Sequence, residues 1–306
     1  MDIRQLKALA QERANASPYD AKKLALFFTG AAVALSFLIT LIGFLLTKQM
    51  EGTGGLSGIG LRTVLSSAQM LVMLAGAVVL PFWNLGYTRA ALDTARDGSA
   101  EPRTLLSGFH LFFPALRLFF LQGALYTLLL TFTAQAGAIL YMFTPAATKT
   151  MALMDSILAD GEVTMTDPLV MEQLIQAAWP IYLIIGILFL VVLIPVMYRL
   201  RLVEFSLVDG QEKALPNMLR SNYLMRGNCV SMFRLDLSFW WYYLLQGLAT
   251  VLAYGDLLIG GDIAYWVFYL LSAAAQLLIG WKFLPQVHTA YALAYDAILN
   301  KKGQRT

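Results

Sequence analysis

The chain has 306 residues, of which 58% are hydrophobic and only 13% are charged. Its mean hydropathy of +0.64 is above that of ordinary soluble domains, so we expect the lipid bilayer to be its solvent. Two histidines and one cysteine exclude most metal sites and any internal disulfide framework, and a net charge of +3 is too small to indicate nucleic acid binding.

The chain opens with an amphipathic segment, residues 1–15, in which apolar side chains recur about every third position between basic ones. Asp2 and Gln5 are placed to cap this segment, and we expect a short helix on the membrane surface. Residues 24–46 follow without a charged side chain. About 23 residues at roughly 1.5 Å each cross a hydrocarbon core of roughly 30 Å, so we predict the first transmembrane helix here.

Five more apolar segments are long enough to cross the hydrocarbon core. They are residues 63–87, 118–143, 177–198, 233–254 and 263–286. Gly255, Gly260 and Gly261 mark the turn between the last two segments. The sequence therefore predicts an all-α integral membrane protein with six transmembrane helices that form three hairpins, each preceded by a cytoplasmic amphipathic helix.

The distribution of Lys and Arg predicts the orientation of these helices. All but three of the 22 basic residues fall at the two termini or in the second and fourth predicted loops; the exceptions are Lys48, Arg62 and Lys149. Basic residues are retained on the cytoplasmic side of membrane proteins. We therefore expect a multipass protein of the cell membrane with both termini in the cytoplasm.

An internal repeat is visible when Pro102 is aligned with Pro216, because Leu105 then falls on Leu219 and Ser107 on Ser221. The returning spans share a proline near their end and an acidic residue after it. The prolines are Pro81, Pro195 and Pro285, and the acidic residues are Asp97, Asp209 and Asp296. We expect each returning helix to kink or end at its proline. The chain is then one membrane domain, 1–306, with pseudo-repeats at 1–99, 100–212 and 213–306; coincidental prolines near helix ends are the alternative.

The run SNYLMRGNCVSMFRLDLSFWWYYLL, within residues 219–247, is the most distinctive part of the sequence. It resembles the signature of a family of uncharacterised bacterial multipass integral membrane proteins, a domain of unknown function. The opening MDIRQLKALAQERA is also similar to that family's start, so the resemblance covers the whole chain. Where relatives continue with Gly-Trp, this chain has the aromatic run 239–243. The resemblance implies a membrane architecture and no activity. A distant likeness to the membrane domain of glycerophosphodiester phosphodiesterases implies a lipid setting.

Asp236 lies about three residues inside the fifth predicted span, at a depth of roughly 5 Å, where a carboxylate needs a partner. Arg234 is two positions away and therefore points elsewhere on a helix. Lys282 lies near the same end of the antiparallel sixth span. We predict a structural ion pair between Asp236 and Lys282, with Arg199 or Arg201 as substitutes. A proton or ion relay through Asp236 is the functional alternative.

Six amide side chains are expected in or near the spans. They are Gln69, Asn84, Gln122, Gln135, Gln246 and Gln276. Such groups usually hydrogen-bond across membrane helices, and they also line polar cavities. The sequence leaves both roles open.

Three basic residues, Arg220, Arg226 and Arg234, stand beside apolar residues ahead of the fifth span. We expect them to face anionic lipid headgroups, at about 1 kcal/mol for each cation. Retention of positive charge on the cytoplasmic side is the simpler explanation of these residues. Cys229, beside Arg226, is expected to be a reduced cytoplasmic thiol.

The sequence contains no nucleotide-binding loop, nucleophile elbow, zinc-ligand spacing or kinase signature. We expect no enzyme activity, no metal and no cofactor. We predict a non-enzymatic membrane scaffold or accessory component; its partners are membrane lipids, and a membrane-protein partner is left open. The alternative is a transporter or lipid-handling protein with a cavity between the three hairpins. Polar side chains that converge between the hairpins would favour this alternative, and a dry, sealed interior would favour the scaffold.

Overall fold

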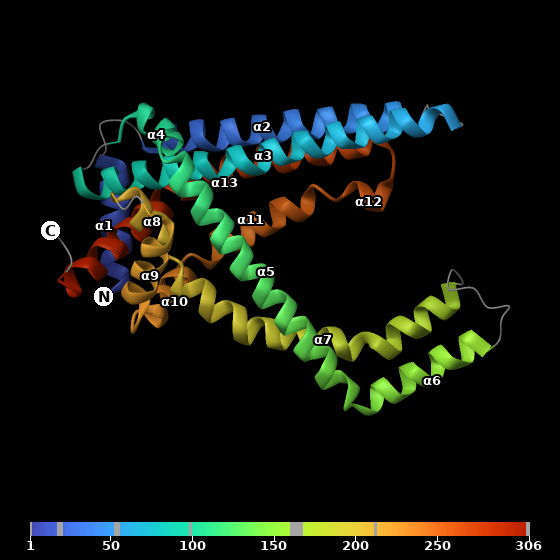
Figure 1. Cartoon of the computed structure of the whole chain (residues 1–306). Coiled ribbons are helices and arrows are strands. Elements are labelled where there is room, and N and C mark those ends of the chain that lie inside the picture. Colours follow the sequence, from blue (N-terminus) through green and yellow to red (C-terminus); the bar gives the residue numbers. More distant parts are fainter. Residues whose placement is uncertain are drawn as a thin grey trace. The chain divides into compact units, whose positions relative to one another are not determined.

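The structure is a computed structural model that describes residues 2–16, 21–51, 56–97, 100–159, 168–210 and 213–303. Its regular elements over these residues are all helices, as the sequence predicts (Figure 1). The chain divides into two compact units: Met1–Leu116 with Leu202–Thr306, and Arg117–Arg201. We call them unit 1 and unit 2 and describe each by itself.

Unit 1 holds the two ends of the chain. Its helices are α1 (Ile3–Ala16), α2 (Ala21–Glu51), α3 (Leu56–Asp97), η1 (Pro102–Leu106), α4 (Ser107–His110), α8 (Val203–Val208), α9 (Ala214–Met225), α10 (Cys229–Ser238), α11 (Trp240–Leu252), α12 (Asp256–Ile259) and α13 (Asp262–Lys301). Unit 2 holds most of α5 (Phe112–Met142), α6 (Pro145–Ala159) and α7 (Pro168–Arg199).

Within the described residues, five helical segments are long and apolar enough to cross a membrane. They are Ala21–Gln49, Thr63–Asp97, Phe112–Met142, Ala178–Val208 and Asp262–Lys301. They contain five of the six predicted spans, except that Phe143 follows the third segment and Ala177 precedes the fourth by one residue each. The remaining span, 233–254, is divided between α10 and α11, which have 10 and 13 residues and are each too short to meet the same test.

Local hydrogen bonding explains why the apolar run around residue 239 is not one helix. Gly227 has φ of +82°, which a glycine adopts without strain, and it ends α9. The side chain of Asn228 then donates to the Leu224 carbonyl at 2.8 Å, which fixes the turn into α10. At the other end, the Phe239 N–H bonds to the Asp236 carbonyl three residues back, at 2.9 Å, and α11 starts as a new helix.

The prolines of the predicted repeat do not end two of the three returning helices. Pro81 lies inside α3 and Pro285 inside α13, and both helices continue to Asp97 and Lys301. A proline removes one backbone hydrogen bond, but packing on the next turn holds the helix. Leu284 and Val287, which flank Pro285, are 5% and 2% exposed. Only α7 ends close to its proline, at Arg199.

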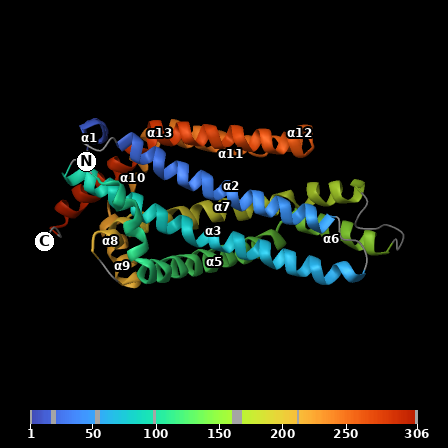
Figure 2. The same ribbon diagram turned by 90° about the horizontal axis from the view of Figure 1, so that it is seen from above.

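The long helices α2, α3 and α13 of unit 1 pack on one another, and α11 packs on α13 (Figures 1 and 2). Aromatic rings join α2 to α3, since Phe28 stacks on Tyr87 at 4.5 Å between ring centroids. The indole N–H of Trp83 also donates to the Phe28 carbonyl at 3.0 Å. Further along, Phe44 of α2 meets Trp266 of α13 edge to face at 5.3 Å.

A close backbone crossing joins α3 to the segment that follows it. A Cβ at Gly86 would collide with the carbonyl oxygen of Leu105, and a Cβ at Gly108 would collide with that of Phe82. Phe82 and Leu105 are 1% and 0% exposed. The two glycines therefore allow η1 and α4 to lie directly on α3.

Helix α1 is confirmed, and Asp2 caps it by accepting a hydrogen bond from the Arg4 N–H at 2.9 Å; the expected part of Gln5 in the cap stays a prediction. Its apolar face is buried within the protein through Leu6, Ala10 and Ala14. The elements it packs on most extensively are α13 and α3. The apolar face of this helix is thus used for packing on unit 1 itself.

In unit 2, α6 packs on α7, and α5 approaches α7 closely at one point, where Gly137 leaves room for Ile185. The hydroxyl groups of Tyr141 and Thr150 are 2.7 Å apart and join α5 to α6. Many large apolar side chains of α5 and α7 are exposed, including Phe120 at 76% and Tyr182 at 69%. Such surfaces are suited to contact with lipid chains.

Candidate functional site

Unit 1 contains an elongated groove of about 480 Å³ between α2, α3, α11 and α13. It is lined by Phe28, Thr29, Ala32, Val33, Ser36, Thr40, Leu80, Asn84, Tyr242, Gln246, Ala253, Tyr269, Ser272, Ala273, Gln276, Gly280, Leu284 and His288. This volume falls in the range of about 300 to 1,000 Å³ that is typical of small-molecule sites.

Helical spacing explains how the polar groups come to face the groove. On α13, Ser272, Gln276 and Gly280 recur at every fourth position, so they share one face of the helix. On α2, Ser36 and Thr40 do the same. The groove follows α13 from Tyr269 to His288, which corresponds to roughly 28 Å of helix length. It therefore extends along most of the apolar length of a membrane span.

Some polar groups of the groove are already held by the protein. The hydroxyl of Ser272 donates to the Ala249 carbonyl at 2.7 Å, and the amide nitrogen of Gln276 donates to the Ser272 oxygen at 3.2 Å. The hydroxyls of Thr40 and Tyr269 lie 3.5 Å apart. These contacts leave the Gln276 carbonyl oxygen and the half-buried amide of Gln246 to offer hydrogen bonds to a bound molecule.

The lining of the groove contains no Asp, Glu, Lys or Arg. Small residues, among them Ala32, Ala273 and Gly280, alternate with the polar ones. Burial of an unpaired charge in such a place is costly, whereas hydroxyl, ester and amide groups find partners. The groove is therefore suited to an uncharged, elongated molecule with a few hydrogen-bonding groups.

The structure brings three of the six predicted amides together in the groove: Asn84, Gln246 and Gln276. Asn84 also donates to the carboxylate of Glu204 in α8 at 3.1 Å. Gln69 is placed beside Gly43 of α2, and Gln122 and Gln135 lie on α5 in unit 2. The amides thus divide into a groove set and a set elsewhere on the helices.

Asp236 has tyrosine partners in the structure. It accepts a hydrogen bond from the hydroxyl of Tyr291 of α13. The hydroxyl of Tyr243 of α11 lies within hydrogen-bonding distance of the Tyr291 hydroxyl and 3.4 Å from the same carboxylate. The Lys282 ammonium lies over the ring of Phe283, 5.3 Å from its centroid. The predicted ion pair between Asp236 and Lys282, and the relay alternative, stay predictions.

An ionic cluster near the ends of α3 and α13 was missed by the sequence interpretation. Arg96 donates to both carboxylate oxygens of Asp296, at 3.0 and 2.6 Å, and to Asp209 at 2.5 Å. Tyr295 donates to the second oxygen of Asp209 at 3.0 Å. A guanidinium that bridges two carboxylates in this way is a strong and directional contact. The cluster fastens α3, the end of α8 and α13 together.

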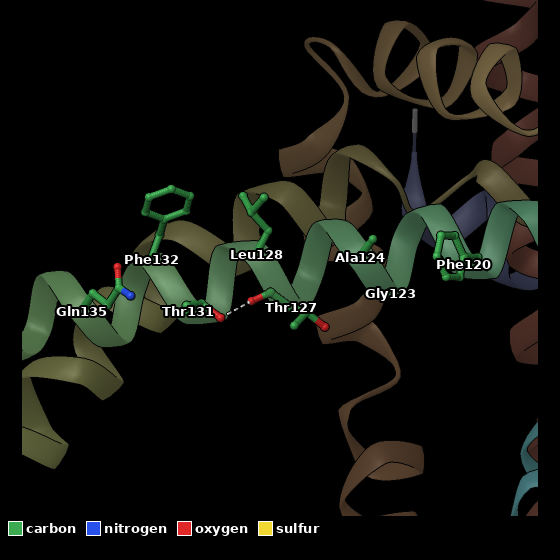
Figure 3. A pocket seen from close by; sticks show the side chains of 8 residues that line it. All are labelled: Phe120, Gly123, Ala124, Thr127, Leu128, Thr131, Phe132 and Gln135. Atoms are coloured by element: carbon green, nitrogen blue, oxygen red, sulfur yellow. Dashed lines mark hydrogen bonds between the residues drawn. The ribbon is translucent and has the colours of Figure 1, made fainter.

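A second hollow, of about 760 Å³, runs along one face of α5 (Figure 3). It is lined by Phe120, Gly123, Ala124, Thr127, Leu128, Thr131, Phe132 and Gln135. The hydroxyl of Thr131 is held by the Thr127 carbonyl at 2.9 Å. All of the lining comes from a single helix, and the hollow is less enclosed by protein than the groove of unit 1.

The basic residues predicted to face headgroups differ in exposure. Arg226 and Arg234 are exposed, and Arg220 is half-buried. Cys229 is partly buried, with its thiol 3.2 Å from the Met225 carbonyl oxygen. In the parts of the chain that the structure describes, no group of three or more His, Cys, Asp or Glu side chains is placed to hold a metal ion.

No protein-family model, curated protein or solved structure matches the chain.

Proposed function

We propose that the protein is a membrane-embedded binding protein for an uncharged amphiphile, a neutral lipid, and that this molecule occupies the groove of unit 1. The sequence alternative was a transporter or lipid-handling protein with a cavity between the three hairpins; the groove proposed here is lined by α2, α3, α11 and α13 of unit 1. The observation that carries it is the convergence of Asn84, Gln246 and Gln276 on one groove whose lining lacks any carboxylate, ammonium or guanidinium group.

The shape of the groove supports a lipid with its long axis along the helices. Four helices contribute to the lining, and small residues keep its middle open. The polar groups are distributed along the length of α13. A glycerolipid carries ester and hydroxyl groups beside its chains and matches such an alternation of polar and apolar wall.

Native mass spectrometry of the protein extracted with its own membrane lipids tests this function. We expect a reproducible bound species of lipid mass that survives removal of the detergent. A protein that appears only as the bare chain, while control membrane proteins keep their lipids, would contradict the proposal.

A scaffold or accessory role is the second candidate, and one observation favours it. Gly123, Thr127 and Thr131 recur at every fourth position along the hollow of α5. Small side chains at this spacing let membrane helices approach one another closely. The same experiment would favour this role if a membrane protein co-purified in stoichiometric amount and no lipid was bound. Both candidates are binding functions, and we assign the protein no catalytic reaction.

We also propose that the chain crosses the membrane six times, as three hairpins, with both termini in the cytoplasm. The packing of α11 on α13 supports a last hairpin, although α11 is short. The distribution of basic residues supports the orientation. The repeats at 1–99, 100–212 and 213–306, and the family resemblance of the LMRGN and FRLDLSF runs, remain part of this proposal.

A further inference from the structure

The two helices before α11 carry an exposed apolar surface that the groove does not explain. On α9, Leu215, Leu219 and Tyr223 are 58%, 60% and 46% exposed and recur at every fourth position. On α10, Val230, Phe233 and Leu237 are exposed in the same manner. We call these six residues the α9–α10 stripe.

The opposite face of α9 is fixed to the protein by buried hydrogen bonds, which hold the apolar face outward. Asn217 and Ser221 are fully buried. Asn217 accepts a hydrogen bond from Ser206 at 2.9 Å, and Ser221 accepts one from the Leu202 N–H at 3.2 Å. The same face of α9 also buries Leu224 and Met225. The outward face nevertheless exposes Leu215, Leu219 and Tyr223, where a helix that faces water carries polar residues.

The surroundings of the stripe are positively charged. Residues 213–238 contain four basic residues and one acidic residue, Asp236, whose carboxylate is held by tyrosines. Arg226 and Arg234 are exposed beside the stripe. The Lys302 ammonium lies over the ring of Tyr223, 4.8 Å from its centroid, and brings a further cation to the same edge.

The stripe is also continuous with aromatic residues of the kind found at membrane interfaces. α10 leads directly into Trp240 and Trp241, which are 47% and 56% exposed and stack on each other. Tryptophan is enriched where the hydrocarbon meets the headgroups. An apolar face bordered by cations and followed by tryptophan matches the chemistry of an anionic bilayer surface.

We propose that α9 and α10 form an interfacial anchor, with the α9–α10 stripe in the acyl-chain boundary of one leaflet and Arg226, Arg234 and Lys302 on the phosphates of anionic lipids. This inference is independent of the groove and of the function proposed for it. The groove would hold a neutral lipid, whereas α9 and α10 would bind anionic headgroups at the membrane surface.

Spin-label accessibility tests the anchor. Cys229 is first replaced by Ser, which can keep a hydrogen bond to the Met225 carbonyl, and a label is then attached through Leu219→Cys or, in a second variant, Leu215→Cys. The matched control is Asn300→Cys at the exposed end of α13. Each protein is placed in nanodiscs of phosphatidylcholine alone or of phosphatidylcholine with phosphatidylglycerol, and collisions with oxygen and with a water-soluble nickel chelate are measured.

We expect the labels on α9 to collide several-fold more with oxygen, and less with nickel, than the label at position 300. We expect this difference between the α9 labels and the label at position 300 to be larger in nanodiscs that contain phosphatidylglycerol. In the double variant Arg226→Gln/Arg234→Gln, we expect phosphatidylglycerol to have no such effect. Nickel access equal to that at position 300 would place α9 in water and overturn the anchor. Shielding from both reagents would place a protein there, and equal depth in both lipids would refute the charge recognition.

Discussion

At the scale of single residues, Arg96 bridges two carboxylates that come from distant parts of the chain. It is 28% exposed, and the side chains of Asp209 and Asp296 are 17% and 11% exposed. Removing one partner leaves two carboxylates close together with no cation between them. We expect Arg96→Gln to destabilise unit 1 by about 1 to 3 kcal/mol, between the costs for an exposed and for a buried ion pair that loses a member. Thermal unfolding in detergent, followed by size-exclusion chromatography, measures the change.

The control for this prediction is Arg103→Gln, since Arg103 is exposed in η1 and a surface charge contributes little. We expect its melting temperature to stay near that of the parent protein. An equal melting temperature for Arg96→Gln and Arg103→Gln would show that the cluster does not hold the three elements together.

Two of the three charged residues in this cluster could be identified from the sequence. Asp209 and Asp296 are singled out by the repeat pattern because each follows a returning span. Arg96 carries no such signal, since its partners are 113 and 200 residues away and their meeting depends on the packing of α3, α8 and α13. The tyrosine partners of Asp236 were missed for a related reason. The predicted partners of Asp236 were all cationic side chains, whereas a carboxylate is also satisfied by hydroxyl donors.

At the scale of elements, the crossing of α3 with η1 and α4 depends on two glycines. A Cβ at Gly86 has no space because the backbone of Leu105 occupies it. We expect Gly86→Ala to separate the two segments and to destabilise the protein by about 1 to 3 kcal/mol, the cost of overpacking a core. Gly123→Ala on α5 is the control, since nothing lies within 4 Å of its added Cβ. Unfolding temperatures of the two variants, compared with the parent, test the crossing; a Gly86→Ala protein as stable as Gly123→Ala would refute it.

Hydropathy predicted the long helices well, because a span needs only length and apolar side chains. At residues 233–254 it predicted one continuous helix, where the structure has α10 and α11, because an average over the window hides the break at Phe239. The returning helices were expected to kink or end at their prolines, and two of the three continue beyond them. Pro81 and Pro285 sit in helices whose next turns are buried, so that packing outweighs the lost hydrogen bond.

At the scale of the whole molecule, the orientation is tested at Cys229, the single cysteine of the chain. It lies at the start of α10, between Arg226 and Arg234. If basic segments stay in the cytoplasm, a membrane-impermeant maleimide should not label Cys229 in intact cells and should label it after permeabilisation. A cysteine introduced at Lys149, on the expected outer side, should be labelled in intact cells and serves as the control. Labelling of Cys229 from outside would reverse the orientation.

The groove was predictable only as one of two alternatives. The sequence supplied its amides but gave no means to separate Gln246 and Gln276 from Gln122 and Gln135, which have the same chemistry and a similar setting. The difference arises from which helices pack together, and α11 and α13 bring the first pair to one face of unit 1. The spacing of Ser272, Gln276 and Gly280 was the available signal, since it marks a continuous polar and small face on α13.

The measurement that tests the central claim most directly compares lipid retention by matched variants in native mass spectrometry. Gln246→Leu/Gln276→Leu removes two amides from the groove and adds no charge. Losing two hydrogen bonds of about 1 kcal/mol each should weaken binding by roughly tenfold or more. Gln135→Leu makes the same chemical change on α5, and we expect it to bind like the parent. Equal loss in both variants, or no loss in the double variant, would contradict a ligand held in the groove of unit 1.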